Sequence, residues 1–419
     1  MDQFSKDQLL NILQDIKNMD QNSFFISVFP IKTIDELWMA WAMNEAEKNE
    51  LSDLACLFLI AFSVEGSIPS FIRKGDLFWQ NRFLPEPNTL LLDAELNIPK
   101  GVVSQLITVL NIEHLVFNSH AALESTFDLD FPLVSNQIKS CSFYNVSSDY
   151  QLKALYSSKS IEKLAFTNVK GEILPKDLSL AISLKTLEFR LCSLNTLPIL
   201  NKNKSKLESV VINESLTAKS VNLDFLPKSL QDLDLSMNKL NNIIGLLNLE
   251  RLENLNISSC FLKGFEFSQV PQNLKRLNLR DNELTIFPKA PNNLMSDLEY
   301  LDVSHNHISE IPTEIVNLKS LNEFLCSHNK LESLPEADSF WAGIIRLDIR
   351  NNHLRNLPNS MINLTKMTYL DVEDNFLTEF THFYKYSGLD RATIRLRGNP
   401  FSNEEKHKLL SLETSYLDL

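Results

Sequence analysis

One pattern of apolar and polar positions repeats along most of the chain: LxxLxLxxNxL, in which x stands for any residue. A clear copy is formed by Leu274, Leu277, Leu279, Asn282 and Leu284. The LxL part places two apolar side chains on the same face of a short β-strand, because side chains alternate between the faces of a strand. Each copy therefore predicts one strand, a turn at the asparagine, and a return segment that adds apolar side chains to the same core.

The asparagine position can be followed in both directions, in steps of 22 to 26 residues that are mostly 23. The fourteen residues that fill this position are Glu95, His120, Val146, Val169, Cys192, Ser215, Asn238, Cys260, Asn282, Asn306, Asn329, Asn352, Asn375 and Asn399. The last eight copies match the pattern strongly, whereas the first three match weakly and leave their register open. Because one copy cannot bury its apolar face alone, the copies are expected to stack into about 14 rungs.

These repeats resemble the leucine-rich-repeat family. Segments such as Ile311-Pro-Thr-Glu-Ile-Val-Asn-Leu318 are similar to its intracellular class, whose repeats are roughly 22–24 residues long. The resemblance covers about residues 87–400. It implies an α/β fold, namely a solenoid shaped as a curved horseshoe with parallel β-strands on its concave face. It also implies that the protein binds another macromolecule.

Both ends of the chain depart from the repeat. Residues 1–86 lack it but contain helical spacing, including a capping box at Thr33–Glu36, so we expect a helical N-terminal region there. This region is interpreted either as a cap on the first rung or as a separate recruitment module; its opening is similar to an F-box but lacks the leading Leu-Pro. Residues 401–419 are expected to form a C-terminal capping helix that begins after Ser402, a favourable N-cap residue.

Composition narrows the possible partners and locations. The formal net charge of −13 disfavours binding to nucleic acid, since phosphate backbones would be repelled. The N-terminus does not resemble a signal peptide, and the densest apolar run, Leu54–Phe62, is too short to cross a membrane. We expect a monomer that is cytoplasmic, or exported without a classical signal peptide. The residue usage would also suit a secreted bacterial effector that acts in the cytosol of another cell.

No motif for catalysis, a cofactor or a metal is present. The nine glycines form neither GxGxxG nor a P-loop, and the five cysteines include no CxxC pair. Four cysteines fall at core positions of the repeat, so we expect buried, reduced thiols. His305 and His328 share a column in neighbouring rungs, but Asp281 and Asn351 beside them make a poor ligand set. We therefore predict no catalytic residues, no cofactor and no metal site.

The residues between the leucines are expected to lie on the concave surface. The residue inside LxL is mostly apolar or small up to Val211 and mostly polar from Asp234 onward. In the last five or six rungs, neighbouring columns add arginine, tyrosine and carboxylate side chains, a composition favoured at interfaces. The predicted protein-binding residues are Arg276, Arg280, Tyr300, Asp302, Glu323, Arg346, Asp348, Arg350, Tyr369, Asp371, Glu373 and Arg395. The alternative is that these charges only keep a solvated surface soluble.

The leading functional hypothesis is a protein–protein interaction module that binds a protein ligand in its concave face. A second hypothesis is an adaptor or ubiquitin-ligase substrate receptor in which residues 1–86 recruit another partner. A third, from a different class, is an enzyme that uses a site without a recognisable motif. The sequence names neither the ligand nor the source.

Overall fold

The computed structural model divides into two compact units. The first unit comprises Met1–Ser193 and Leu197–Lys206, and the second comprises Leu194–Thr196 and Leu207–Leu419. The structure describes residues 89–93 (backbone only), 113–118, 137–146, 158–289, 295–361, 364, 366–387, 389, 391–412 and 417–419. The helical region predicted for residues 1–86 lies outside these residues, as do Glu95, His120 and Cys56. The domain boundaries that the sequence suggests stay predictions.

The first unit contains five parallel strands of equal length. They are β1 (Thr89–Asp93), β2 (His114–Asn118), β3 (Ser140–Tyr144), β4 (Lys163–Thr167) and β5 (Thr186–Arg190). Their pairing aligns the inner residues of successive LxL motifs, namely Leu91, Val116, Ser142, Ala165 and Glu188. The register that the three weakest copies left open is therefore the one obtained by extending the repeat backwards.

The second unit continues the same architecture with shorter strands. Its parallel sheet contains β6 (Ser209–Asn213), β8 (Asp232–Asp234), β10 (Asn254–Asn256), β11 (Arg276–Asn278), β12 (Tyr300–Asp302), β13 (Glu323–Leu325), β14 (Arg346–Asp348), β15 (Tyr369–Asp371), β16 (Thr393–Arg395) and β17 (Leu417–Asp418). Two return segments pair separately as β7 (Ser220–Asn222) and β9 (Asn242–Ile244). The sheet confirms the predicted solenoid of parallel strands.

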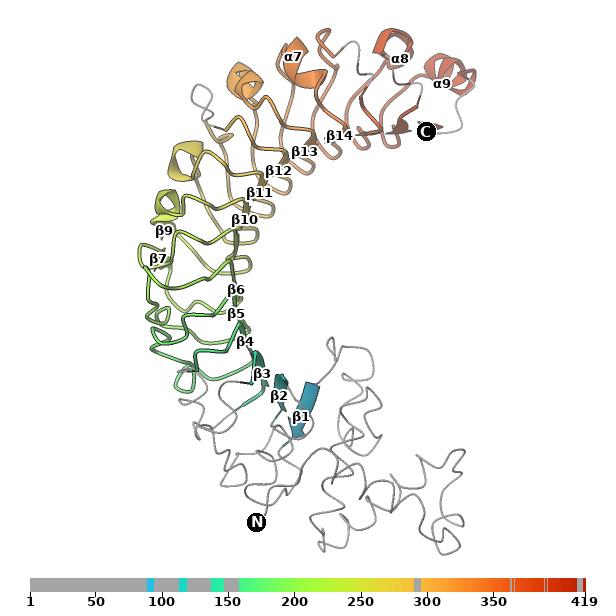
Figure 1. Cartoon of the computed structure of the whole chain (residues 1–419). Helices are drawn as coiled ribbons and strands as arrows, with labels where there is room; N and C mark the ends of the chain where they lie inside the picture. The colour runs from blue at the N-terminus through green and yellow to red at the C-terminus, as the bar shows by residue number, and fades with distance from the viewer. Residues whose placement is uncertain are drawn as a thin grey trace, which may run out of the picture. The chain divides into compact units, whose positions relative to one another are not determined.

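Among the residues that the structure describes, helices are few and short, and they belong to the return segments. In the second unit they lie on the outer side of the array, whereas the strands line its inner side (Figure 1). They are the 3-10 helices η3 (Leu246–Asn248), η4 (Phe267–Gln269) and η5 (Thr313–Asn317), and the α-helices α7 (Asp338–Trp341), α8 (Thr381–Ser387) and α9 (Asn403–Leu410).

Asparagine side chains join successive rungs in the core of the second unit. Asn306 is 4% exposed, and its Nδ2 donates to the carbonyls of Val303 at 2.9 Å and Leu279 at 3.0 Å. Its Oδ1 accepts the backbone N–H of Leu284 at 3.0 Å. One amide therefore satisfies buried backbone groups of its own rung and of the preceding rung, as the repeat predicts. Asn329, Asn352, Asn375 and Asn399 repeat this arrangement.

The core of the first unit contains stacked phenylalanine rings in place of the asparagine amides. Phe117, Phe143, Phe166 and Phe189 occupy the second apolar position of LxL, and their rings stack at centroid distances of 4.9, 5.0 and 5.2 Å. All four side chains are buried. The asparagine column there holds Val146, Val169 and Cys192, which are buried without amide groups. Aromatic stacking thus runs along the first unit, where the asparagine ladder is absent from the described rungs.

A left-handed residue precedes the asparagine position in every described rung. From Asn145 to Asp374 these residues have φ between 48° and 60°, and at the last rung Gly398 has φ of 74°. Non-glycine residues adopt this conformation at a cost, which asparagine and aspartate bear most easily. The column nevertheless contains Leu191, Glu214 and Met237. The tight turn is therefore imposed by the packing of the rungs on both sides.

The C-terminal part of the second unit is closed by α9 and β17. Ser402 caps α9, since its Oγ accepts the Glu405 N–H at 3.1 Å, as the sequence predicts. Glu405 in turn accepts the N–H groups of Phe380 at 2.8 Å and Thr381 at 2.7 Å, at the start of α8. Burial opposes ionisation of this carboxyl, but the two backbone donors hold the pKa of Glu405 below its usual value.

The described cysteines are buried and free, as expected. Cys141, Cys192, Cys260 and Cys326 lie in the cores of their units. Burial raises the pKa of Cys260 to about 11 and raises the pKa values of Cys141 and Cys326 further above the normal range. Within the part of the chain that the structure describes, no helix has the length and apolar character needed to cross a bilayer.

Candidate binding face of the second unit

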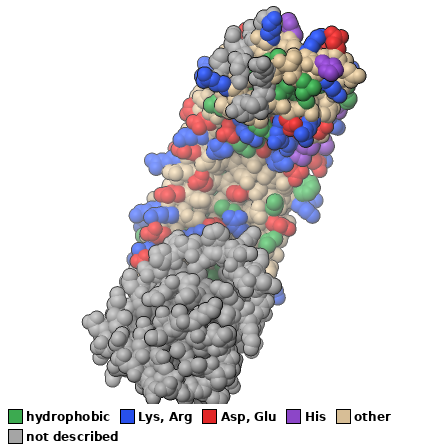
Figure 2. Space-filling view, turned by 90° about the vertical axis from the view of Figure 1, so that its right-hand side faces the viewer, with side chains coloured by type: hydrophobic (Ala, Val, Ile, Leu, Met, Phe, Trp, Pro, Cys, Tyr) green, Lys and Arg blue, Asp and Glu red, His purple; other side chains and the backbone are tan. Residues whose placement is uncertain are grey.

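We define the inner face as the side chains that project from the second unit's sheet on the side opposite the leucine core. All twelve predicted protein-binding residues lie on this sheet or directly after its strands, between Arg276 and Arg395. Figure 2 shows this side of the molecule, with a largely uncoloured polar area in the middle and basic and histidine side chains gathered above it. Parallel pairing places residues of the same column in neighbouring rungs side by side.

A hollow of about 460 Å³ opens on the inner face between β6 and β12. It is lined by Ser209, Val210, Val211, Asp232, Leu233, Asp234, Asn254, Leu255, Asn256, Arg276, Asn278 and Tyr300. Most of these side chains are polar, and only Arg276 and Tyr300 were among the predicted residues. Sequence reasoning emphasised charged and aromatic residues and so passed over the asparagines, although they fill the same columns.

The hollow presents hydrogen-bonding groups that the protein uses only in part. The Oδ1 atoms of Asn256 and Asn278 accept backbone N–H groups two residues later, at 3.2 Å from Ser258 and 2.9 Å from Arg280. Neither Nδ2 donates a hydrogen bond to any residue that the structure describes. These amides are therefore oriented by the backbone while their donors remain available to a ligand's carbonyl or hydroxyl oxygen.

Two arginine–tyrosine stacks stand on the inner face. The Arg276 guanidinium lies over the Tyr300 ring, and the Arg346 guanidinium lies over the Tyr369 ring, each at 4.1 Å from the ring centroid. Glu323 occupies the rung between the two stacks. Both arginines are exposed and both tyrosines are half-buried, so each stack is a rigid pair with an accessible cation.

The three predicted aspartates differ from the expectation of solvent-facing groups. Asp302, Asp348 and Asp371 are only 3%, 8% and 0% exposed. Each accepts the backbone N–H two residues later, at 2.8, 3.3 and 3.1 Å. The residue inside LxL thus closes a local turn when it is Asp or Asn, which draws the carboxylate inward. These aspartates hold the inner face in shape and offer little surface to a ligand.

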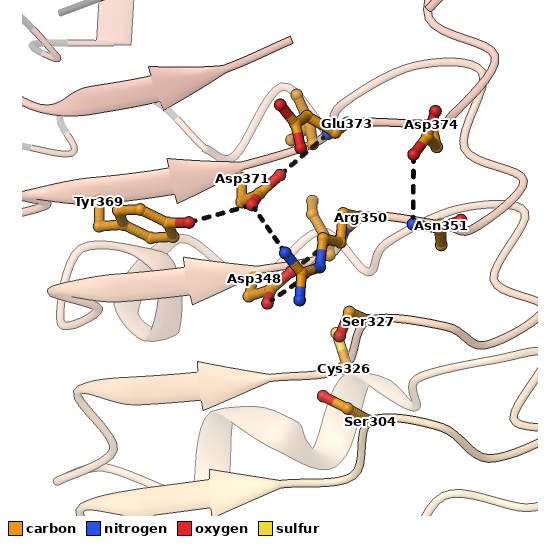
Figure 3. Close-up of polar contacts among 12 residues, drawn as sticks. Ser304, Cys326, Ser327, Asp348, Arg350, Asn351, Tyr369, Asp371, Glu373 and Asp374 are labelled. Carbon is orange, nitrogen blue, oxygen red and sulfur yellow. Dashed lines mark hydrogen bonds and ion pairs between the residues drawn. The ribbon is translucent and has the colours of Figure 1, made fainter. Parts of the chain in front are cut away.

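The buried carboxylates also orient the tyrosines and Arg350. Tyr369 donates its hydroxyl to Asp371 at 3.0 Å (Figure 3), and Tyr300 donates to Asp302 at 3.4 Å. Arg350 lies 3.7 Å from Asp348 and 3.8 Å from Asp371, as two ion pairs. Burial, and then the aspartate, raises the pKa of Tyr300 to about 12 and also raises that of Tyr369. Both tyrosines remain neutral donors at physiological pH.

The remaining predicted residues lie around this network. Arg395 places its guanidinium 6.0 Å from the Tyr369 ring centroid. Glu373 donates its backbone N–H to Asp371, and burial, followed by the charge of Asp371, raises the pKa of its carboxyl. Arg280 is half-buried and lies two residues after Asn278, which lines the hollow. The structure therefore brings the predicted residues onto one face, while leaving their role in binding untested.

The two histidines singled out from the sequence are stacked. The rings of His305 and His328 lie 4.0 Å apart between centroids, with an interplanar angle of 21°. Asp281, in the same column, accepts the hydroxyl of Ser259 at 2.8 Å. Among the described residues, no group of three or more His, Cys, Asp or Glu side chains is arranged to hold a metal ion.

The repeats also match known proteins. A family model described as "Leucine rich repeat" matches residues 272–331. Lumican of Oryctolagus cuniculus is 33% identical over 156 residues, which cover 31% of this chain and 80% of that protein. The chain belongs to the leucine-rich-repeat family. Lumican of Rattus norvegicus is 27% identical over 214 residues, 42% of this chain and 63% of that protein, so the chain spans just under two thirds of this relative.

Solved structures show the same fold. A leucine-rich-repeat protein of Leptospira interrogans has a TM-score of 0.53 at 22% identity, over 77% of this chain and 93% of that one. TLR13 in complex with single-stranded RNA has a TM-score of 0.56 at 17% identity, over 80% of this chain and 57% of that one. The leucine-rich-repeat family supports a general role as a protein-binding module.

Proposed function

We propose that the protein binds a protein ligand through the inner face of its second unit, between β6 and β16. The observation that carries this proposal is one continuous surface. It is formed by the 460 Å³ hollow, by the Arg276–Tyr300 stack, which also lines the hollow, and by the Arg346–Tyr369 stack. Hot spots at protein interfaces are enriched in tyrosine and arginine anchors surrounded by polar groups. The contact residues are Arg276, Tyr300, Glu323, Arg346, Tyr369 and Arg395, supported from below by the buried aspartates.

A protein ligand is favoured over nucleic acid by charge. The chain carries a formal net charge of −13, and two of the side chains that line the hollow are the carboxylates of Asp232 and Asp234. A phosphate backbone would be repelled by both. TLR13, a structural relative, is bound to RNA in its solved complex, so RNA is included as a competitor in the experiment below.

The experiment compares ligand capture by the wild-type chain and by Arg276→Ala with Arg346→Ala. Both arginines are exposed, so the double variant should melt at the wild-type temperature. We expect at least tenfold weaker capture of the bound protein, since loss of an interface anchor costs about 2 kcal/mol or more. Quantitative mass spectrometry of the captured proteins, with and without added RNA, measures this loss.

His307→Ala with His353→Ala is the matched control, because both histidines are exposed and lie on the turns that follow the strands. Capture should survive in this control. If the histidine pair abolished capture and the arginine pair did not, the ligand would bind elsewhere and the proposal would be wrong. Capture that RNA displaces completely would also contradict a protein ligand.

Two finer roles remain proposals of their own. One is a secreted effector in another cell's cytosol, and the other is an adaptor in which residues 1–86 recruit a second partner. They differ in the number of partners, because an adaptor binds two proteins at once. A second captured protein that persists in the arginine double variant, and is lost when residues 1–86 are replaced, would support the adaptor.

A further inference from the structure

Two buried serine hydroxyls on the inner face have no hydrogen-bond partner. Ser304 and Ser327 occupy the same column in neighbouring rungs and are 1% and 0% exposed. Within the described part of the chain, neither Oγ finds an acceptor or donor. An unsatisfied buried hydroxyl costs about 1–3 kcal/mol, so such a group needs an explanation. Figure 3 shows Ser327 on the rung next to that of Arg350, and Ser304 one rung further away.

Earlier rungs show how a serine in this column is normally satisfied. Ser236 donates its hydroxyl to Asp234 Oδ1 at 2.6 Å, and Ser258 donates to Asn256 Oδ1 at 2.8 Å. At Ser327 the corresponding residue is Leu325, which offers no acceptor. At Ser304 the Asp302 carboxylate accepts only the backbone N–H, at 2.8 Å, and its other oxygen accepts Tyr300. Ser327 therefore has no acceptor at this position, and the Ser304 hydroxyl makes no bond to Asp302, which accepts from Ser304 the N–H alone.

Cationic and imidazole groups surround these hydroxyls. Arg280 precedes Ser304 in the column and Arg350 follows Ser327, while His305 and His328 form the adjacent column. Arg280 makes no ion pair with any residue that the structure describes, and Arg350 Nε makes no hydrogen bond there. Burial, and then the charges of Arg280 and Arg350, lowers the pKa of His328; burial and Arg280 likewise lower that of His305. The two guanidinium groups thus oppose protonation of the histidine pair, while Asp281, Asp302 and Asp374 act in the opposite direction.

We propose that Arg280, Ser304, Ser327 and Arg350, with the stacked His305 and His328, form a subsite for an oxyanion. Hydroxyl, guanidinium and imidazole N–H groups are the donors that phosphate and carboxylate oxygens accept. Among the nearby carboxylates, Asp302 accepts Ser304 N–H and Tyr300, and Asp281 accepts Ser259. Asp348 and Asp371 pair with Arg350 only at 3.7 and 3.8 Å, beyond hydrogen-bond distance, so the Arg350 Nε donor is left for the oxyanion.

Thermal melting tests the subsite with small ions, independently of the protein ligand proposed above. Wild-type protein is melted in sodium phosphate, sodium acetate and sodium chloride at equal ionic strength. A ligand that binds the folded state raises the melting temperature in proportion to its occupancy. We expect phosphate or acetate to raise it above the chloride value, and the larger rise tells whether phosphate or a carboxylate is the better occupant.

Ser304→Ala with Ser327→Ala should weaken oxyanion binding at least tenfold, as should Arg280→Gln. The control, Ser258→Ala, removes a satisfied hydroxyl from the same column and should leave the oxyanion response intact. In chloride alone, the double alanine variant should melt no lower than wild type, because the hydroxyls that it removes have no partner in the wild-type protein. Ser258→Ala should melt lower than wild type, because it removes a hydroxyl that makes a hydrogen bond.

Nuclear magnetic resonance provides a second readout, since the imidazole protons of His305 and His328 should shift on oxyanion addition while those of His353 do not. The proposal is overturned if neither phosphate nor acetate exceeds chloride, or if the double alanine variant responds like wild type. A double variant that melts as low as Ser258→Ala in chloride would also overturn it, because the hydroxyls would then have partners within the protein.

Discussion

The two units stack the same repeat with different side chains between the rungs. In the first unit four phenylalanine rings stack from rung to rung, and in most rungs of the second unit an asparagine amide connects the rung to the preceding one. Stacked rings pack among apolar neighbours and set the spacing of the rungs. Amides bond to particular backbone groups and therefore also fix the orientation of the backbone. The polar inner face occurs where the amides occur, so a precise backbone accompanies the surface that we propose for binding.

Strand length follows this division except at β6, the first strand of the second unit, which has five residues. Strands β1 to β5 each have five residues, while β8 and β10 to β16 have three. In most of the shorter strands, an Asp or Asn inside LxL accepts the N–H two residues later, as at Asp234 and Asn278. This hydrogen bond removes one N–H donor from strand pairing. Leu325 and Arg395 lack the bond, but their strands have the same length as the neighbouring strands.

The largest expected effect comes from breaking the aromatic stack. Phe166 is fully buried between Phe143 and Phe189, so Phe166→Ala should reduce the free energy of unfolding by about 3–5 kcal/mol. Hydrogen exchange should show the greatest loss of protection in β3, β4 and β5. Phe376→Ala, at a side chain that is 50% exposed, is the control and should change stability by less than about 0.5 kcal/mol. Equal losses of unfolding free energy in the two variants would show that the aromatic stack does not stabilise the first unit.

Removing one ladder amide should have the next largest effect. Asn306→Val leaves the buried N–H of Leu284 without its acceptor, whereas the carbonyls of Leu279 and Val303 keep the donors Asn282 Nδ2 and Asn329 Nδ2. Urea unfolding should show a loss of about 1–3 kcal/mol, the cost of one unsatisfied buried group. The reverse exchange, Val169→Asn in the first unit, should also destabilise. If Val169→Asn were stabilising, the two cores would be interchangeable and the comparison would fail.

Acid should destabilise the second unit through Glu405, a buried carboxylate whose ionised form accepts two backbone N–H groups; the described part of the first unit buries no carboxylate. Because the pKa of Glu405 is lowered in the folded state, its contribution is present above the usual value of 4.5 and lost as pH falls through the folded pKa. Glu405→Gln should therefore lower stability by about 1 kcal/mol at neutral pH, and the difference should vanish in acid.

Chemical unfolding at several pH values measures this difference. Glu404→Gln is the matched control: its carboxylate pairs with Lys408 at 2.7 Å on the exposed side of α9, where such pairs contribute little. A gap between wild type and Glu405→Gln that stayed constant down to strongly acidic pH would show that Glu405 acts through its shape and not its charge.

The repeat pattern predicted the fold and the register because leucine spacing and the asparagine column act locally in every rung. The same columns placed Arg276 beside Tyr300 and Arg346 beside Tyr369, a proximity that parallel pairing makes readable from the sequence. The phenylalanine stack carried a comparable signal, since its four members share one column.

The burial of the aspartates was not predicted, because it depends on a hydrogen bond whose signal is weak in sequence. An Asp or Asn inside LxL was read as a surface charge, although either side chain readily accepts an N–H two residues later. The hollow was also missed, since its asparagines resemble ordinary solvated residues until five strands bring them together.

The column of left-handed residues acts as a filter on how the repeat can change by mutation. Between Asn145 and Gly398 it contains asparagine, aspartate, histidine, serine, glutamate, leucine, methionine and glycine, but no valine, isoleucine, threonine or proline. Branching at Cβ or a ring at the backbone nitrogen makes this conformation inaccessible, so such substitutions are removed even where nothing else touches the side chain. The absence of these residues from one position per repeat therefore indicates the register of a degenerate repeat, even where its leucines have been replaced.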